Sequence, residues 1–158
     1  MLWPRSVHGL RREVPDVRHE VEAWCAEEAI PRPSDALIAD FYVPMAQWIA
    51  EHADDRMLVL GLSGAQGTGK SRLARLLKLL LERLYGMRIA ILSLDDLYLT
   101  SAERLRRAEK FHPLLATRGV PGTHDVSLGL RTLAALREEK PLALPRFDKA
   151  RDDRAPVA

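Results

Sequence analysis

The sequence has 158 residues, 47% of them hydrophobic and 29% charged, which suits one ordinary globular domain and is unlike a disordered chain. The formal net charge is only +2 and the arginines are scattered, so nucleic acid is not favoured as a partner. The single cysteine, Cys25, excludes an internal disulfide, and no stretch has the length and apolarity of an export signal or a membrane span. We therefore expect a cytoplasmic protein with no membrane partner.

Residues 1–56 are expected to form a helical flank. Four apolar residues recur at helical spacing before the stop at Pro31: Val17, Val21, Trp24 and Cys25. Ser34 is the predicted N-cap of a second helix, which Pro44 should kink. Its apolar stripe is Leu37, Phe41, Met45, Trp48 and Ile49. We interpret the stripe as core-facing, with docking of a partner as the alternative.

Residues 57–158 are expected to form the core of an α/β fold. Residues 57–62 are a short apolar run typical of a buried parallel strand, and residues 87–94 form a second one. Between them, leucines at helical spacing predict an amphipathic helix that stops at Gly86. The order strand, glycine loop, helix, strand predicts a βαβ unit in a parallel sheet.

The C-terminal part reads as helices and loops. Thr100 and Glu103 have capping-box spacing for a short helix, and residues 111–124 read as a loop. A further helix should start at Asp125, with an inner face formed by Val126, Leu130, Leu133 and Leu136. Residues 141–145 are interpreted as a short edge strand.

The strongest chemical signal is a phosphate-binding loop. Its residues are Gly64, Ala65, Gln66, Gly67, Thr68, Gly69, Lys70 and Ser71, and Arg72 follows. Glycines let backbone amides turn toward phosphate oxygens, Lys70 would contact the β- and γ-phosphates, and the Ser71 hydroxyl would bind magnesium. The motif predicts binding of ATP with Mg²⁺; the alternative is a glycine-rich turn that binds nothing.

Two carboxylates follow the second predicted strand. Asp95 and Asp96 would lie at its carboxyl end, where open α/β sheets place ligands. A carboxylate there can accept the proton of an attacking hydroxyl or hold magnesium, and Asp95 is our candidate for both. The alternative is an acidic pair that caps a turn.

The loop from Arg118 to Asp125 is dense in polar groups and could contact a substrate. On local grounds alone, Asp125 is more often a plain N-cap, and His124 is more often a surface histidine than a catalytic base.

Four blocks in order resemble the P-loop small-molecule kinases that include D-glycerate 3-kinase, uridine kinase, pantothenate kinase and phosphoribulokinase. They are residues 61–71, 93–100 and 118–125, and residues 145–149 with Asp153 and Arg154. The likeness is to the D-glycerate 3-kinase type. It implies a parallel sheet of the P-loop NTPase type flanked by helices.

The resemblance also implies transfer of the ATP γ-phosphate to a hydroxyl of a small carboxylate, D-glycerate giving 3-phosphoglycerate. Asp95 matches the general base, with Lys70 as the second catalytic residue, and Asp125 matches an acceptor-binding aspartate. The candidates that bind the substrate carboxylate are Arg118, His124 and Arg146, because a guanidinium fork fits a carboxylate. Asp96 and Tyr98 complete the expected substrate site.

Relatives of this type continue into further strands, so the C-terminal strands are expected to be missing here, with one sheet edge uncovered and available for self-association. Two alternatives stay open: a nucleotide-binding module without catalysis, and a related kinase that acts on a nucleoside, pantothenate or a sugar phosphate.

Overall fold

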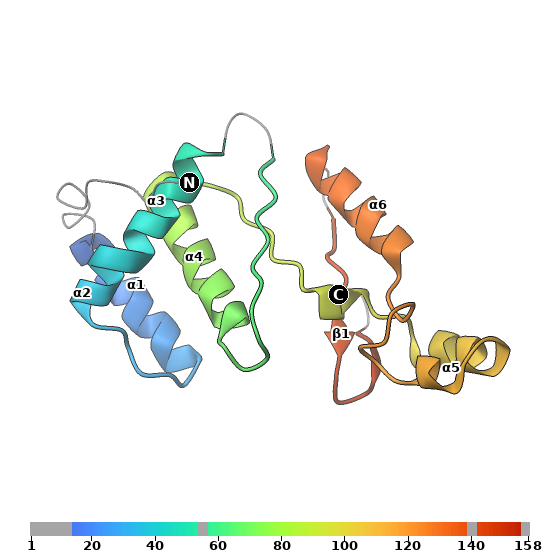
Figure 1. Ribbon diagram of the computed structural model, residues 1–158. Helices are drawn as coiled ribbons and strands as arrows, with labels where there is room; N and C mark the ends of the chain where they lie inside the picture. Colours follow the sequence, from blue (N-terminus) through green and yellow to red (C-terminus); the bar gives the residue numbers. More distant parts are fainter. Residues whose placement is uncertain (1–13, 54–56, 139–141, 156–158) are drawn as a thin grey trace. The chain divides into compact units, whose positions relative to one another are not determined.

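The structure is a computed structural model that describes residues 14–53, 57–138 and 142–155. It divides into two compact units, one ending at Ile91 and the other beginning at Leu92 (Figure 1). Each unit is described by itself.

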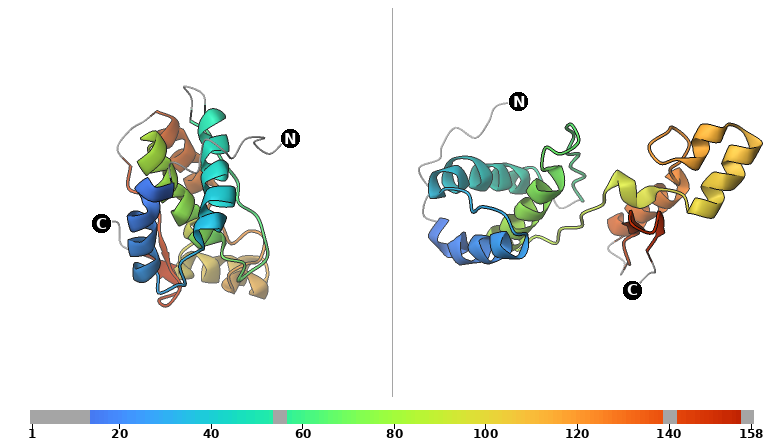
Figure 2. Two further views of the ribbon diagram at one scale, coloured as in Figure 1. Left: turned by 90° about the vertical axis from the view of Figure 1, so that its left-hand side faces the viewer. Right: turned by 90° about the horizontal axis from the view of Figure 1, so that it is seen from below.

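The first unit is helical. Its elements are α1 (Val14–Glu27), α2 (Asp35–Leu37), the π-helix η2 (Ile38–Tyr42), α3 (Val43–Glu51) and α4 (Lys70–Tyr85). Helices α1 and α3 both pack on α4, and the three stay grouped in further views (Figure 2). The buried core residues are Val17, Val21, Cys25, Ile38, Ala39, Val43, Ala46, Ile49, Leu76, Leu77, Leu80 and Leu81. The flank helices and the helix after the glycine loop thus share one core, and the predicted division at residue 56 stays a prediction.

The predicted stripe of the second flank helix is partly wrong. Ser34 does cap this helix, by accepting a hydrogen bond from the amide of Leu37 at 3.2 Å. However, Leu37 and Phe41 are about two-fifths exposed, at 42% and 41%, while Ile38 is fully buried. The reason is η2, because a π-helical turn shifts which residues face the core. This turn lies just before Pro44, which has no backbone N–H to donate to the helix.

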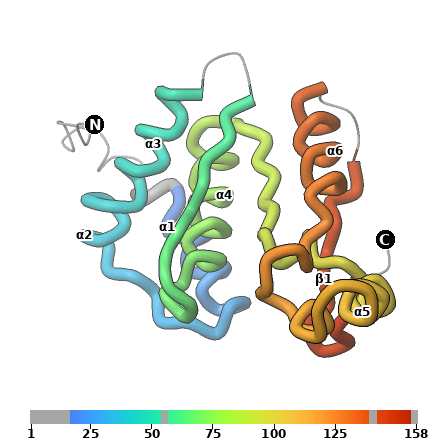
Figure 3. Tube along the Cα trace, turned by 45° about the vertical axis from the view of Figure 1, so that its right-hand side comes forward, coloured from blue at the N-terminus to red at the C-terminus, as the bar shows by residue number. Residues whose placement is uncertain are grey.

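The two predicted strands of the βαβ unit are extended, but neither belongs to a sheet among the described residues. Residues 57–62 run as an extended trace beside α4 (Figure 3), with Val59 exposed at 57% and Leu60 at 44%. A strand belongs to a ladder of hydrogen bonds with a neighbour, and the two-stranded sheet that the described residues form contains neither residues 57–62 nor residues 87–93. The expected burial of residues 57–62 is therefore not observed, and a parallel sheet is not formed by the described residues.

The second unit combines short helices with a hairpin. Its elements are η3 (Leu94–Leu97, 3-10), α5 (Ser101–Lys110), η4 (Pro113–Ala116, 3-10), α6 (Val126–Arg137), β1 (Phe147–Asp148) and β2 (Asp153–Arg154). Strands β1 and β2 pair antiparallel, with Phe147 opposite Arg154. Residues 142–145 are not a strand, so the predicted edge strand there is wrong and strand pairing begins at Phe147.

The predicted inner face of α6 is also partly wrong. Val126 and Leu130 are 67% and 64% exposed, while Gly129 and Thr132 are buried. A Cβ at Gly129 would lie 2.9 Å from Cδ1 of Leu97, so the missing side chain lets α6 approach η3 closely on that face.

Among the described residues, no helix combines the length and the apolar character that crossing a membrane requires.

Candidate functional site

The glycine loop forms a sharp turn that leads into α4. Gly67 and Gly69 have φ values of 79° and 83°, which residues with a side chain rarely adopt. At Gly64 a Cβ would lie 3.2 Å from Oγ1 of Thr68 and 3.6 Å from Cδ of Lys70. Each of the three glycines is therefore explained by backbone conformation or by close approach.

The turn is exposed to solvent and leads directly into the first turn of a long helix. Residues 61–69 are exposed, and α4 begins at Lys70. The first-turn amides of a helix lack acceptors within the helix and carry the positive end of its dipole. With Ser71 and Arg72 exposed in this turn, the segment has the features of an anion-binding site.

Lys70 lies across the loop. Its Nζ donates to the carbonyl of Ala65 at 2.6 Å, and the Thr68 hydroxyl donates to the same carbonyl at 2.8 Å. The ammonium is thus held at the loop by the loop's own backbone rather than in the core.

Asp95 lies in η3 of the second unit and contacts two partners. Nζ of Lys149 lies 2.6 Å from its Oδ2, and the Tyr98 hydroxyl lies near enough to the carboxylate to lower its pKa. The hydrogen bond from Lys149 holds the pKa of Asp95 below its ordinary value despite partial burial. Burial raises the pKa of Tyr98, and the nearby Asp95 charge raises it further. Asp95 is therefore an ionised carboxylate at neutral pH.

Asp96 has a clear structural role. Its Oδ2 accepts from the amide of Ser93 at 3.2 Å and pairs with Arg146 at 3.0 Å, while its Oδ1 accepts from the amide of Phe147 at 3.1 Å. This carboxylate closes the capping box of η3 and ties that turn to β1. Its predicted contact with a substrate stays a prediction.

His124 is brought onto Tyr98 by backbone pairing. The two residues form an isolated antiparallel bridge, and their rings stack with centroids 4.2 Å apart. On either side, the amide of Leu99 donates to Thr123 at 2.9 Å and the amide of Asp125 donates to Leu97 at 2.7 Å. The predicted substrate loop is thus fixed in register against the segment that carries Asp95.

Asp125 is the N-cap of α6, as its local pattern predicts. Its Oδ1 accepts from the amide of Leu128 at 2.9 Å, and its Oδ2 pairs with Nη2 of Arg154 at 2.9 Å. Burial alone would raise the pKa of Asp125, but the Leu128 amide and the Arg154 guanidinium outweigh it, so the pKa is lowered.

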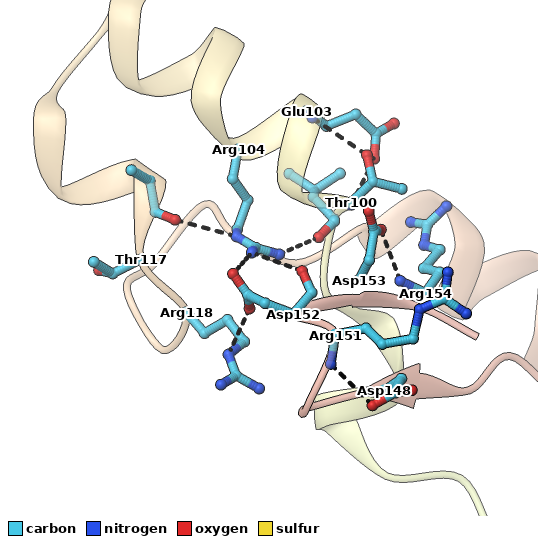
Figure 4. A network of polar contacts seen from close by, with 12 residues as sticks. Thr100, Glu103, Arg104, Thr117, Arg118, Asp148, Arg151, Asp152, Asp153 and Arg154 are labelled. Atoms are coloured by element: carbon cyan, nitrogen blue, oxygen red, sulfur yellow. Dashed lines mark hydrogen bonds and ion pairs between the residues drawn. The ribbon is translucent and has the colours of Figure 1, made fainter.

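Arg118 belongs to a network of arginines and carboxylates (Figure 4). Its Nε lies 3.0 Å from Oδ1 of Asp152, and its guanidinium carbon is 5.5 Å from the centroid of the Phe147 ring. Asp152 also pairs with Arg104, whose side chain is buried.

The second unit therefore contains all of the predicted acceptor-site residues: Asp95, Asp96, Tyr98, Arg118, His124, Asp125 and Arg146. The predicted ATP-binding residues, Gly64 to Arg72, lie in the first unit. Sequence reasoning missed the contacts of four further residues, Arg104, Lys149, Asp152 and Arg154. Their contacts join distant parts of the chain, and only the resemblance in the last block pointed to that region.

The residues predicted to hold magnesium carry oxygen donors, which Mg²⁺ prefers. The Ser71 hydroxyl is exposed and the Asp95 carboxylate is ionised, so both suit the ion chemically. Among the described residues, no group of three or more His, Cys, Asp and Glu side chains is arranged to hold a metal.

Comparison with known proteins gives several relatives, although no family model matches the chain. The uncharacterized kinase mug58 of Schizosaccharomyces pombe is 38% identical over 102 residues, 62% of this chain and 36% of that protein. The chloroplastic D-glycerate 3-kinase of Arabidopsis thaliana is 35% identical over 144 residues, 78% of this chain and 31% of that protein. The probable ATP-dependent kinase TDA10 of Saccharomyces cerevisiae is 35% identical over 132 residues, 75% of this chain and 44% of that protein.

A solved structure, described as "Structure of YGR205w protein", is 34% identical with a TM-score of 0.61, over 77% of this chain and 45% of that one. The chain spans less than half the length of the curated relatives it matches.

These matches define the class: the chain is a homologue of kinases, one of which is described as a probable ATP-dependent kinase. Within that class it is similar, over 78% of its own length, to a D-glycerate 3-kinase.

Proposed function

We propose that this chain binds Mg-ATP through residues 64–72 and transfers the γ-phosphate to a hydroxyl of a small carboxylate, with D-glycerate as the acceptor and 3-phosphoglycerate as the product. The observation that carries the ATP part is the exposed glycine turn, with Lys70 held across it, at the start of α4. The support for the acceptor is the relative named D-glycerate 3-kinase.

In the proposed reaction, Asp95 is the base. Its lowered pKa keeps it ionised, so it can accept the proton of the acceptor hydroxyl as the oxygen attacks the γ-phosphorus and ADP leaves. Lys70 and the loop amides stabilise the phosphate charge. Magnesium, with Ser71 and Asp95 as its proposed ligands, would neutralise further phosphate charge when bound.

The acceptor is proposed to lie beside Tyr98. Arg118 is the main candidate to bind the carboxylate of the acceptor, and His124 and Arg146 are further candidates. Asp125 is the candidate to bind a hydroxyl of the acceptor. The support is that one loop carries Arg118, His124 and Asp125, and that this loop is held in register against the segment containing Asp95 and Tyr98. A guanidinium supplies the planar fork that fits a carboxylate.

The proposal includes a parallel sheet of the P-loop type, with residues 57–62 and 87–94 as two of its strands. Residues 58–60 support it, because their apolar side chains are exposed here and would be covered in a parallel sheet, which has helices on both faces. Self-association through an uncovered edge and a cytoplasmic location also remain predictions; the latter rests on the single cysteine.

The test is acceptor-dependent release of ADP. The protein is incubated with Mg-ATP alone, with D-glycerate, and with a panel containing a nucleoside, pantothenate and a sugar phosphate. We expect release with D-glycerate only. The variant Asp95→Asn should bind a fluorescent ATP analogue normally and lose the release.

The outcomes separate the alternatives. Binding of the analogue without release for any acceptor would favour a non-catalytic nucleotide-binding module. Release with another member of the panel would replace D-glycerate as the acceptor. Normal release by the Asp95→Asn variant would show that Asp95 is not the base.

A further inference from the structure

Asp152 joins two arginines in the turn of the β1–β2 hairpin. Its Oδ2 lies 2.6 Å from Nη2 of Arg104, and its Oδ1 lies 3.0 Å from Nε of Arg118 (Figure 4). The residue has φ 54°, a left-handed conformation that few residues other than glycine adopt. The turn therefore accepts an unfavourable backbone conformation at the position from which one carboxylate reaches both guanidinium groups.

Arg104 fixes one side of this bridge. Its relative exposure is 0%, and it donates to the carbonyls of Leu99 at 2.6 Å, Ala116 at 3.3 Å and Asp152 at 3.2 Å, besides its pair with the Asp152 carboxylate. A buried charge is stable only when it is paired and hydrogen-bonded, so these contacts leave Arg104 little freedom. Asp152 is consequently anchored from the core of the second unit.

The Asp152 carboxylate in turn lies against the Nε side of the Arg118 guanidinium. A guanidinium can bind a carboxylate through Nε and one Nη, or end-on through Nη1 and Nη2. Asp152 holds the Nε side as an ion pair rather than through a hydrogen bond, since its Oδ1 has no hydrogen-bond donor among the described residues. The end-on way through Nη1 and Nη2 remains for a ligand, because the described ion pair of Arg118 is at Nε. The Phe147 ring makes a cation–π contact with this guanidinium, with the ring centroid 5.5 Å from its central carbon.

The next residue connects this arginine to the proposed base. Gly119 has φ 88°, and a Cβ there would lie 3.9 Å from the Tyr98 hydroxyl, which lies near Asp95. Arg118 is also close enough to Tyr98 for its charge to lower the phenol pKa, against the larger effects that raise it. The charged end of Arg118 therefore lies near Tyr98, which is itself a neighbour of Asp95.

We propose that Asp152 is a positioning residue, which holds Arg118 by Nε so that its Nη1 and Nη2 bind the carboxylate of the acceptor end-on. Asp152 itself does not touch the acceptor. This inference rests on the proposed function. It adds that selectivity for a carboxylate is set by a bridge from buried Arg104, through Asp152, to Arg118.

The competing explanation is that Asp152 only neutralises Arg104. Both explanations predict a loss of stability when the charge is removed. They differ in acceptor binding, because only the positioning role links Asp152 to the acceptor KM. A KM and a ratio of kcat/KM values do not depend on the fraction of the protein that is folded, so they separate the two.

The test compares Asp152→Asn, Asp152→Glu, Arg118→Lys and the double variant Asp152→Asn/Arg118→Lys in the full chain. Asparagine tolerates the left-handed conformation and keeps one carbonyl oxygen, while glutamate keeps the charge for Arg104 but displaces Arg118. For each variant we measure the KM for D-glycerate, the KM for ATP, kcat, the kcat/KM ratio of D-glycerate to glycerol, and the melting temperature. Glycerol presents hydroxyls without a carboxylate.

We expect both single changes at Asp152 to raise the KM for D-glycerate about tenfold, because Arg118 loses the ion pair that orients it and binds the acceptor carboxylate less well by about 1.4 kcal/mol. The ratio of D-glycerate to glycerol should fall by the same factor, while kcat and the KM for ATP stay unchanged. Because Arg118→Lys already removes Nε, adding Asp152→Asn to it should change the D-glycerate KM no further.

Unchanged D-glycerate KM in Asp152→Asn and Asp152→Glu would overturn the inference while leaving the kinase activity in place. An additive effect in the double variant would show that Asp152 only neutralises Arg104. The same conclusion would follow if Asp152→Asn did not fold while Asp152→Glu had the normal KM for D-glycerate. A wild-type chain without D-glycerate-dependent turnover would overturn the proposed function, and the inference with it.

Discussion

Tyr98 and His124 stack with ring centroids 4.2 Å apart and an angle of 26° between their planes. The same two residues pair through their backbones in an isolated antiparallel bridge. This double contact fixes the orientation of the phenol, whose pKa is raised by burial and further by the nearby Asp95 carboxylate. The ionisation of Asp95 therefore depends on its neighbours, and that dependence can be measured.

Replacing Lys149 by Met should raise the pKa of Asp95, because the hydrogen bond from Lys149 is the largest cause of its depression. A depressed folded pKa means that the carboxylate is lost only as pH falls through that low value. With Lys149 gone, protonation begins at higher pH. We expect the acid limb of the profile of kcat/KM against pH to move to higher pH.

The variant Tyr98→Phe provides a graded comparison, because it keeps the stacked ring and removes a smaller contribution to the same depression. Its acid limb should move in the same direction by less. Lys110→Met, at the exposed last residue of α5, is the matched control and should leave the profile unchanged. An acid limb that stays in place in Lys149→Met would show that Asp95 does not control the rate.

Replacing Lys70 by Ala should weaken ATP binding by at least about tenfold, because an ammonium that contacts phosphate is lost. The free energy of unfolding should change by less than about 1 kcal/mol, since Lys70 Nζ donates to the carbonyl of Ala65 in the exposed loop rather than to a group in the core. Titration with a fluorescent ATP analogue and urea unfolding measure the two effects. Arg83→Ala, near the other end of α4, is the control and should bind the analogue normally.

Asp125 has two separable roles. Serine at this position keeps the N-cap of α6 and loses the pair with Arg154, while alanine loses both. We expect the free energy of unfolding of Asp125→Ala to be about 1 kcal/mol lower than that of Asp125→Ser, as measured by urea unfolding. Both variants should show a raised KM for the acceptor. A normal acceptor KM in Asp125→Ser would restrict Asp125 to capping.

Replacing Leu80 by Ala should destabilise the first unit by about 2–5 kcal/mol, because this side chain has 0% exposure at the contact of α4 with the flank helices. Leu105→Ala makes the same change at a residue of α5 that is 51% exposed and should cost less than about 1 kcal/mol. Urea unfolding followed by circular dichroism compares them. Equal losses in the two variants would contradict the described core.

Features set by neighbours along the chain were predicted correctly from sequence. The capping box of Thr100 with Glu103, the caps at Ser34 and Asp125, and the stop of α4 at Gly86 were all expected and are observed. In each case the interacting groups lie within one or two helical turns, so a short motif contains the whole cause.

Features that depend on distant partners were not predicted. Residues 57–62 have the composition of a strand, yet strand pairing requires a neighbour that their own sequence does not specify. Arg104 has the pattern of a surface residue on a polar helix, and only its contacts with Ala116 and Asp152 explain its burial. The exposed side of α6 follows from the close approach of Gly129 to Leu97, which no periodicity reveals.

The glycine loop lies in the first unit and the acceptor residues lie in the second. Under the proposed function, each substrate is therefore a reporter for a different half of the chain. Amide hydrogen exchange should slow around α4 when nucleotide is added, and around Tyr98 and the hairpin when D-glycerate is added. A peptide-by-peptide map of that protection would reveal, without any turnover, whether either ligand is felt in the half that does not bind it.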